Sequence, residues 1–216
     1  MKRNLRALGA LASIAVAATT FLSQAHAAPV LSLSLTPAAS VAFGGAVGVD
    51  IFVSGLTGTV GGYDFDLKYD SSRMSFSAMF ADPDTRMGDG GHPALDFSTG
   101  NVSPSVGFSV LSGFFLPSDE ATLAGLQGTG FRLGHVDFTA LSNPGVAAFS
   151  FSNFSLSNYD GTAAYRDVTA TGGQLCVFAP GTVPCPNNSV PEPTSALLVA
   201  AALGGLALSR RQVKAA

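Results

Sequence analysis

The feature that most constrains the fold is a two-residue alternation of apolar and small polar side chains along the middle of the chain. In residues 31–35, 47–53 and 105–110, Leu, Val, Ile or Phe takes every second position, and Ser, Gly or Asp fills most positions between. Residues 74–78 and 135–140 repeat the pattern. Because successive side chains of a strand point to opposite faces, this period indicates strands with one buried and one solvated face.

Turns rich in Gly, Pro, Asn and Asp separate these segments, and long helices do not alternate with them. This order is typical of an all-β, two-sheet antiparallel sandwich. Between Phe149 and Leu156 the apolar positions shift by one residue, which predicts a β-bulge or bend at Ser152–Asn153. The one helix expected between the two ends of the chain is Ser118–Gln127, with Ser118 as its N-cap.

The first 27 residues have the pattern of a secretory signal peptide. Basic residues stand within the first six positions, an apolar run follows at residues 7–22, and Ala25-His26-Ala27 has the small-x-small pattern of a cleavage site. We therefore expect an N-terminal signal helix in residues 1–27 and a mature chain that begins at Ala28. A retained anchor is the alternative, but the apolar run is short for a membrane span.

The tail, residues 190–216, contains a Val-Pro-Glu-Pro sequence, an apolar run at residues 194–208 and a basic end, in that order. As a helix the apolar run would be about 22 Å long, against a hydrocarbon core of about 30 Å, so it is a marginal transmembrane helix. The basic residues after it favour a cytoplasmic C-terminus, with the preceding chain outside. The residues of this motif are Val190, Pro191, Glu192, Pro193, Arg210 and Arg211.

This order of features resembles the PEP-CTERM sorting signal of exopolysaccharide-producing Gram-negative bacteria. The resemblance implies recognition by an exosortase-type membrane transpeptidase and a transient stay in the inner membrane. It also implies removal of the tail and delivery to the cell surface or the extracellular biofilm matrix. Because it covers residues 190–216 alone, it does not say what the exported part binds.

Between the two ends, residues 28–190 carry five basic and thirteen acidic side chains, a net charge of −8. This length suffices for one domain with one hydrophobic core. We assign the domain to residues 28–180 and expect a linker at 181–189, which contains prolines and asparagines. The acidic balance argues against a nucleic-acid partner, since phosphates need a basic surface.

Residues 61–70 give the clearest strand of the domain. Its alternation places Phe65 and Leu67 on the core face, and Asp64 and Asp66 on the opposite face. Two carboxylates at positions i and i+2 lie about 6.5–7 Å apart along a strand, which could serve acid and base roles in catalysis. A solvated strand face explains the same residues, and we expect this explanation to hold.

Several segments of the domain occur in an order that is known from one family. They are Val47–Leu56, Tyr63–Asp70, Met74–Phe76, the short helix at Ala121–Gln127 that runs into Phe131–Leu141, and Phe149–Gly161. Together they resemble a cohesin-type domain from about Val30 to Phe178. The resemblance implies a jelly-roll sandwich of about nine strands, shared by cohesins and some carbohydrate-binding modules. Family cohesins bind dockerins through one exposed sheet face, but we transfer no recognition residue to this chain.

A loop with three aspartates, Asp82, Asp84 and Asp89, is a candidate calcium site, because flexible oxygen-rich loops suit Ca²⁺. However, Arg86 stands where a calcium loop would have an oxygen ligand, and the bidentate Glu of such loops is missing. A solvated turn explains the same residues. Calcium therefore stays an alternative, and we expect no cofactor.

Cys176 and Cys185 are the only cysteines of the chain. Because both targeting segments indicate export to an oxidising compartment, we expect these two cysteines to form a disulfide. A cysteine nucleophile or a zinc site is the alternative. Either would need histidine neighbours, and the sequence around the two cysteines contains none.

Hydrolase chemistry has few candidates in the mature part of the chain. Its two histidines are His92 and His135, and it contains neither G-x-S-x-G nor H-E-x-x-H. Either histidine could still join a catalytic triad built by the fold. We expect a protein that is not an enzyme, because the outward faces show no convergent cluster of histidine and carboxylates.

The sequence thus predicts an exported, non-catalytic surface or matrix protein that binds another protein through an outward sheet face. A carbohydrate-binding module acting on exopolysaccharide is the alternative. It ranks second because a flat polysaccharide-binding face needs exposed aromatic side chains. The chain has no Trp and four Tyr, and two of these, Tyr63 and Tyr69, are predicted to face inward.

The tail predicts how the protein is sorted. Replacing Pro191, Glu192 and Pro193 by alanine should leave full-length protein in the inner membrane, because the transpeptidase would no longer recognise its substrate. Membrane fractionation followed by intact mass measurement checks this. If the variant reached the surface normally and were trimmed at the same place, the sorting interpretation would fail.

Overall fold

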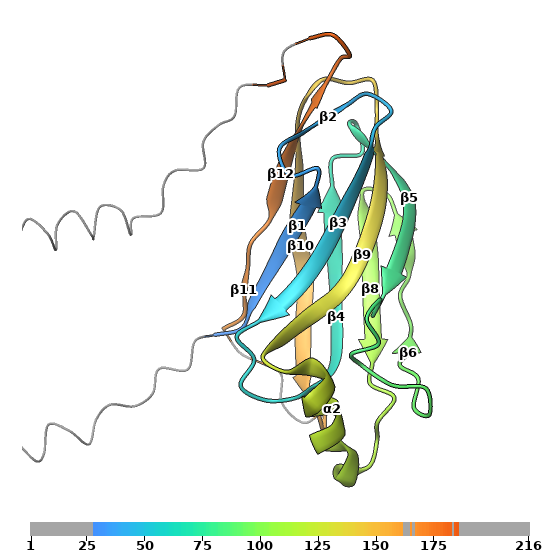
Figure 1. Cartoon of the computed structure of the whole chain (residues 1–216), viewed down its shortest axis with the longest axis vertical. Coiled ribbons are helices and arrows are strands. Elements are labelled where there is room, and N and C mark those ends of the chain that lie inside the picture. The colour runs from blue at the N-terminus through green and yellow to red at the C-terminus, as the bar shows by residue number, and fades with distance from the viewer. Residues whose placement is uncertain (1–27, 162–164, 166, 183, 186–216) are drawn as a thin grey trace, which may run out of the picture. The chain divides into compact units, whose positions relative to one another are not determined.

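A computed structural model describes residues 28–161, 165, 167–182 and 184–185. Within these ranges the chain folds into a β-sandwich of two sheets with one short helical segment (Figure 1). The predicted signal peptide at 1–27, part of the linker and the sorting signal at 190–216 lie outside the described residues. The described part contains no helix that is long and apolar enough to cross a membrane.

The first sheet, sheet A, has the strand order β11-β1-β3-β9-β5. Strand β3 lies at its centre and pairs antiparallel with β1 and β9, and β9 pairs antiparallel with β5. The strands of sheet A are β1 (Val30–Thr36), β3 (Ala46–Ser54), β5 (Met74–Ala81), β9 (Gly130–Ala140) and β11 (Thr169–Ala170).

The second sheet, sheet B, has the order β2-β12-β10-β4-β8-β6, and β7 also pairs with β8. Its centre is formed by β4, which pairs antiparallel with β8 and β10. The strands of sheet B are β2 (Ser40–Ala42), β4 (Val60–Tyr69), β6 (Leu95–Asp96), β7 (Gly100–Val102), β8 (Ser105–Leu111), β10 (Gly145–Asn158) and β12 (Gly173–Phe178).

The strand count and the pairing correct two details of the prediction. The described residues form twelve strands rather than about nine, because β2, β6, β7 and β11 are edge segments of two or three residues. The sheets are mostly antiparallel, but β2 pairs with β12 and β11 with β1 in parallel. At both segments the chain crosses to the other sheet, adds one short edge strand there and returns.

The helical segment begins differently from the prediction. A 3₁₀ turn, η1 (Pro117–Asp119), precedes the helix α2 (Glu120–Gln127), so the N-cap of α2 is Asp119 and not Ser118. The early turn displaces the start because Pro117 suits the first positions of a helical turn. At the other end, Gln127 is buried, and its side chain bonds both the N–H and the C=O of Val60 at 2.8 Å, which fixes α2 to the start of β4.

Aromatic side chains from both sheets form the centre of the core. Phe138 of sheet A lies with its ring centroid 4.8 Å from Tyr69 and 5.5 Å from Phe149, both on sheet B. Phe65 and Phe108 stack on each other at 4.8 Å. The residues predicted to face inward are all fully buried: Phe65, Leu67, Phe108, Val136 and Phe138.

Two backbone features let these strands pack. A Cβ at Gly134 would lie 2.5 Å from Cε1 of Phe108, so only glycine lets the ring of sheet B lie against β9. On β10 the pairing with β4 shifts between Ser152 and Ser155, and Asn153 has a φ of 54°. This is the bulge that the one-residue shift of the apolar positions predicted. Because of it, apolar side chains on both sides of the bulge, such as Phe149 and Leu156, face the core.

Candidate functional site

The outer side of sheet B presents a largely polar surface, which we call the serine–aspartate face: the outward residues of β4, β8 and β10. Asp64 lies between Ser109 of β8 and Ser155 of β10. Asp66 and Lys68 follow along β4 on the same face, and Asp64 and Lys68 are exposed. The strand therefore carries its carboxylates outward, as the sequence predicted. Most neighbouring outward residues are serines and glycines, while Leu111 of β8 and Val146 of β10 add exposed apolar side chains to the same face.

Asp66 is oriented by the bulge of β10. The amide of Asn153 donates a hydrogen bond of 2.6 Å to Oδ2 of Asp66. On the other side, a Cβ at Gly107 would lie 2.2 Å from Oγ1 of Thr99, so this glycine allows the chain before β7 to lie over β8. The bulge of β10 thus fixes the carboxylate of Asp66, whereas Asp64 beside it is exposed.

Apolar side chains border this face at the free edge of sheet B. Leu95 of β6 and Leu111 of β8 are paired across the strands, with exposures of 40% and 44%. Val102 of β7 is exposed at 65%. Apolar atoms gathered beside a polar surface are typical of protein interfaces, where an apolar centre provides burial and polar groups give specificity.

The outer side of sheet A carries a network of charged side chains, which we call the aspartate–histidine network: Asp50, Asp84, Arg132, His135 and Asp137. Asp50 accepts a hydrogen bond of 2.7 Å from Arg132 and lies 2.8 Å from Nδ1 of His135. Asp137 lies 3.0 Å from Nε2 of the same ring. Asp84 accepts a hydrogen bond of 2.7 Å from the other terminal guanidinium nitrogen of Arg132.

This network corrects the expectation that the outward faces bring no histidine and carboxylates together. The sequence shows that Asp50 and His135 each point outward from their strands. It does not show that they are opposite each other in the β3–β9 register. Gly48 makes room for the ring, because a Cβ there would lie 3.2 Å from Cε1 of His135.

The network ties three segments of the domain together: β3 through Asp50, β9 through Arg132, His135 and Asp137, and the loop after β5 through Asp84. Each ring nitrogen of His135 has a carboxylate partner within the domain. Burial raises the pKa of Asp50, but the hydrogen bonds from Arg132 and His135 outweigh it and hold that pKa below its usual value. The hydrogen bond to Asp84 and, after it, the hydrogen bond to Asp50 raise the pKa of Arg132.

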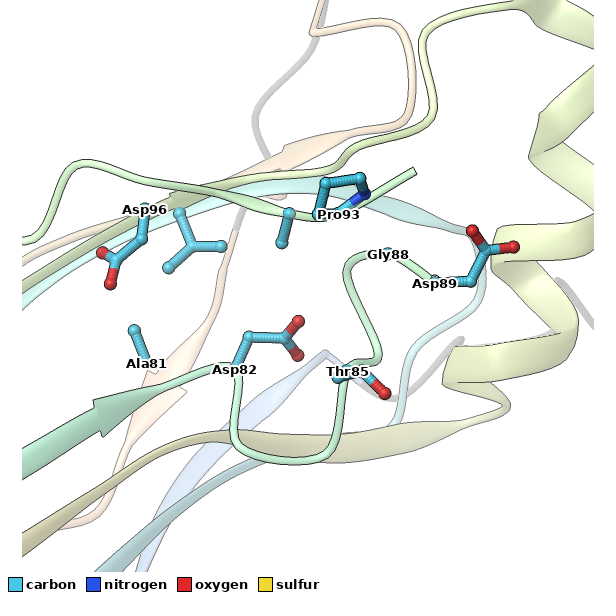
Figure 2. A pocket seen from close by; sticks show the side chains of 9 residues that line it. Ala81, Asp82, Thr85, Gly88, Asp89, Pro93 and Asp96 are labelled. Carbon is cyan, nitrogen blue, oxygen red and sulfur yellow. The ribbon is translucent and has the colours of Figure 1, made fainter. Parts of the chain in front are cut away.

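A small pocket lies at the edge of the sandwich, between the end of β5 and the start of β6 (Figure 2). Asp82 points toward the loop that carries Thr85 and Gly88, Pro93 lies across the space from it, and Asp96 and Asp89 lie at the two ends. Burial raises the pKa of Asp82, although hydrogen bonds from the backbone N–H groups of Arg86 and Met87 lower it in part.

The candidate calcium residues do not converge. Asp82 accepts backbone N–H groups, Asp84 pairs with Arg132, and Asp89 accepts the N–H groups of Gly91 and of the residue after it. These backbone bonds lower the pKa of Asp89. Across the described residues no group of three or more His, Cys, Asp or Glu side chains is placed to hold a metal ion.

The remaining candidates, His92 and the two cysteines, are held by contacts within the chain. His92 lies in the loop before β6, with Nδ1 3.3 Å from Asp89 and its ring 4.9 Å from that of Phe114. It is therefore on a different element from His135, which lies on β9. Cys176 and Cys185 are both disulfide-bonded, in agreement with the prediction.

Comparison with solved structures identifies the fold of the domain that carries these residues. No family model and no curated protein matches the chain. Among solved structures, a cohesin module of a Clostridium perfringens family 33 glycoside hydrolase matches with a TM-score of 0.53, 14% identity, and coverage of 70% of this chain and 98% of the other. A type II cohesin in a cohesin–X-dockerin complex from Acetivibrio cellulolyticus matches with a TM-score of 0.56, 11% identity, and coverage of 69% and 99%.

A third similar structure is the non-cellulosomal cohesin of the archaeon Archaeoglobus fulgidus, with a TM-score of 0.50, 13% identity, and coverage of 71% and 93%. At these identities the likeness establishes the fold. The chain contains a cohesin-like domain, a β-sandwich of two sheets that accounts for almost the whole length of the matched modules.

The network on sheet A predicts a stability change for Asp50→Asn. At pH 7 we expect the free energy of unfolding to fall by about 1–2 kcal/mol, since hydrogen bonds to charged groups are strong but this site is partly solvated. Because the folded pKa of Asp50 is lowered, its contribution is present above its unfolded pKa of about 3.9 and is lost as the pH falls through the folded value. Urea unfolding at pH 7 and pH 3 measures this, and the difference between wild type and variant should shrink at pH 3.

Asp64→Asn is the matched control, because Asp64 is exposed and takes part in none of the ion pairs among the described residues. Its effect should stay within about 0.5 kcal/mol. A loss for Asp50→Asn that is equally large at pH 3 would contradict the ion-pair explanation.

Proposed function

We propose that this protein is an exported, non-catalytic binding protein of the cell surface or extracellular matrix, and that it binds a protein partner through the serine–aspartate face. The observation that carries this proposal is the combination of a cohesin-like fold with an exposed sheet face that has aspartates at its centre and apolar side chains at its edge.

The fold supports a protein as partner. Similar structures include the sixth cohesin of an Acetivibrio cellulolyticus scaffoldin in complex with a dockerin, with a TM-score of 0.52 and 15% identity. A dockerin-like module is therefore one class of partner to test. With a net charge of −8 over residues 28–190, association should be faster for a partner that presents basic side chains to Asp64.

The composition of the face favours protein over polysaccharide. The outward positions of β4 and β8, from Gly62 to Lys68 and from Ser105 to Leu111, hold no aromatic side chain, because the aromatic residues of both strands face the core. A flat saccharide-binding surface depends on exposed rings that can stack on sugars. Phe97, which is 58% exposed and donates its N–H to the carbonyl oxygen of Ser109, brings one ring to the border of this face. A single ring offers a saccharide less stacking surface than a row of several, so the carbohydrate-binding alternative ranks second.

Export and sorting belong to the same proposal. The signal peptide at residues 1–27 and the sorting signal at 190–216 would direct the domain, residues 28–180, across the inner membrane of a Gram-negative bacterium. The linker at 181–189 would separate it from the exosortase-type cleavage region. The disulfide supports passage through an oxidising compartment.

A pair of matched substitutions tests the face. Ser155→Arg introduces a long cation opposite Asp64 on sheet B, and Ser34→Arg does the same opposite Asp50 on sheet A. Both serines are exposed, so both variants should fold. Quantitative affinity capture from extracellular matrix extract should show binding of one protein partner reduced roughly tenfold or more by Ser155→Arg and unchanged by Ser34→Arg.

Loss of binding in the Ser34→Arg variant alone would move the interface to sheet A and contradict the proposal. Retention of purified exopolysaccharide in place of any protein, with the same dependence on Ser155, would favour the carbohydrate-binding alternative.

A further inference from the structure

The pocket of Figure 2 has the size of a single side chain. Its volume is about 230 Å³, below the roughly 300–1,000 Å³ of pockets that hold drug-sized ligands. It opens where the two sheets end in their edge strands, β5 in sheet A and β6 in sheet B. Ala81, Pro93, Ala94 and Val110 supply apolar walls, and Asp82 is the carboxylate that points into it.

The carboxylate of Asp82 is held in place by the loop that follows β5. Its Oδ1 accepts the N–H of Arg86 at 2.7 Å, and its Oδ2 accepts the N–H of Met87 at 3.2 Å. Since a carboxylate has about four lone-pair sites, these bonds fix its position and leave it able to accept more donors. Gly88 allows the tight turn, because a Cβ there would lie 2.3 Å from the carbonyl oxygen of His92.

No ion pair among the described residues holds this carboxylate, although the charge of Arg86 lowers its pKa in part. Arg86 is closest in sequence, but its guanidinium donates to the carbonyl oxygen of Leu126. None of the ion pairs formed among the described residues involves Asp82 or Asp96. Burial raises the pKa of Asp82 and so disfavours its charge, and a ligand that brings a positive charge would recover that cost.

We propose that this pocket binds the side chain of a lysine from a protein partner, with its methylene groups against the alanine, proline and valine walls and its ammonium group on the carboxylate of Asp82. A lysine combines a flexible apolar stem with a compact charge, which is the combination that the walls and the carboxylate offer. Asp96 at the mouth would add attraction for the approaching charge.

Other ligand classes fit less well. Ca²⁺ takes about six to eight oxygen ligands, whereas Figure 2 shows one carboxylate directed into the pocket. A neutral apolar group would match the walls but would leave the carboxylate desolvated without a partner. The guanidinium of arginine shares the charge but is wide and planar, so it serves as a comparison probe.

The pocket adjoins the serine–aspartate face, because β6 supplies both Leu95, at the border of that face, and Asp96, at the pocket. A partner lying across sheet B could therefore place one lysine over the edge and into the pocket. This role as an anchor rests on the proposed function, whereas binding of a lysine side chain does not.

Nuclear magnetic resonance titration of the full chain tests the binding directly. The probe is Nα-acetyl-lysine amide, and the readout is the amide shifts of Arg86, Met87 and Ala94. We expect saturable shifts with a dissociation constant in the millimolar range, and much weaker shifts with the uncharged norleucine analogue. Nα-acetyl-arginine amide should bind less tightly than the lysine probe.

Three variants separate the pocket from its surroundings. Asp82→Asn keeps an oxygen acceptor for the loop and should weaken lysine binding at least tenfold. Ala94→Leu fills the pocket while leaving Asp82 intact, and should abolish binding. Glu120→Gln removes an exposed charge outside the pocket lining and should have no effect.

Equal shifts with the norleucine analogue, or binding unchanged by both pocket variants, would overturn the proposal. So would a calcium titration that saturates the same amides with higher affinity and is lost in Asp82→Asn. Because the probe needs no partner protein, failure here leaves the Ser155→Arg capture experiment unaffected, and failure of that experiment leaves lysine binding standing.

Discussion

Contact between aromatic side chains of opposite sheets holds this sandwich together. Phe138 projects from sheet A onto Tyr69 and Phe149 of sheet B, and each fully buried phenylalanine contributes roughly 1.5–3 kcal/mol through the area that it removes from water. The rings fit because glycine at position 134 lets Phe108 approach the backbone of β9. Every second position of each central strand is thereby committed to the core.

The same commitment leaves the alternate positions free for function, and the two outer faces use them differently. On sheet A, Asp50 and Asp137 both face His135, and Asp50 is also paired with Arg132, so these charges are largely satisfied within the domain. On sheet B, Asp64 has no such partner among the described ion pairs and is surrounded by small side chains. We infer that sheet A stabilises the domain and sheet B is available for recognition.

Local sequence pattern predicted much of this architecture, because alternation identifies both a strand and its inward side. Phe65, Phe138 and the bulge near Asn153 were predicted on that basis. Contacts between distant segments could not be predicted, since they depend on register: Asp50 meets His135 only because β3 and β9 align them. The pocket at Asp82 is similar, since it needs β6 and the loop after β5 to lie together, and no spacing along the chain encodes that.

Carboxyl footprinting of the protein with and without its captured partner tests the central claim most directly, because it reports on both faces in one measurement. Asp64 marks the serine–aspartate face, and Asp137, whose side chain is 44% exposed, marks the opposite face. Our account predicts that the partner slows chemical labelling of Asp64 and leaves that of Asp137 unchanged. Protection of Asp137 with Asp64 still freely labelled would contradict it.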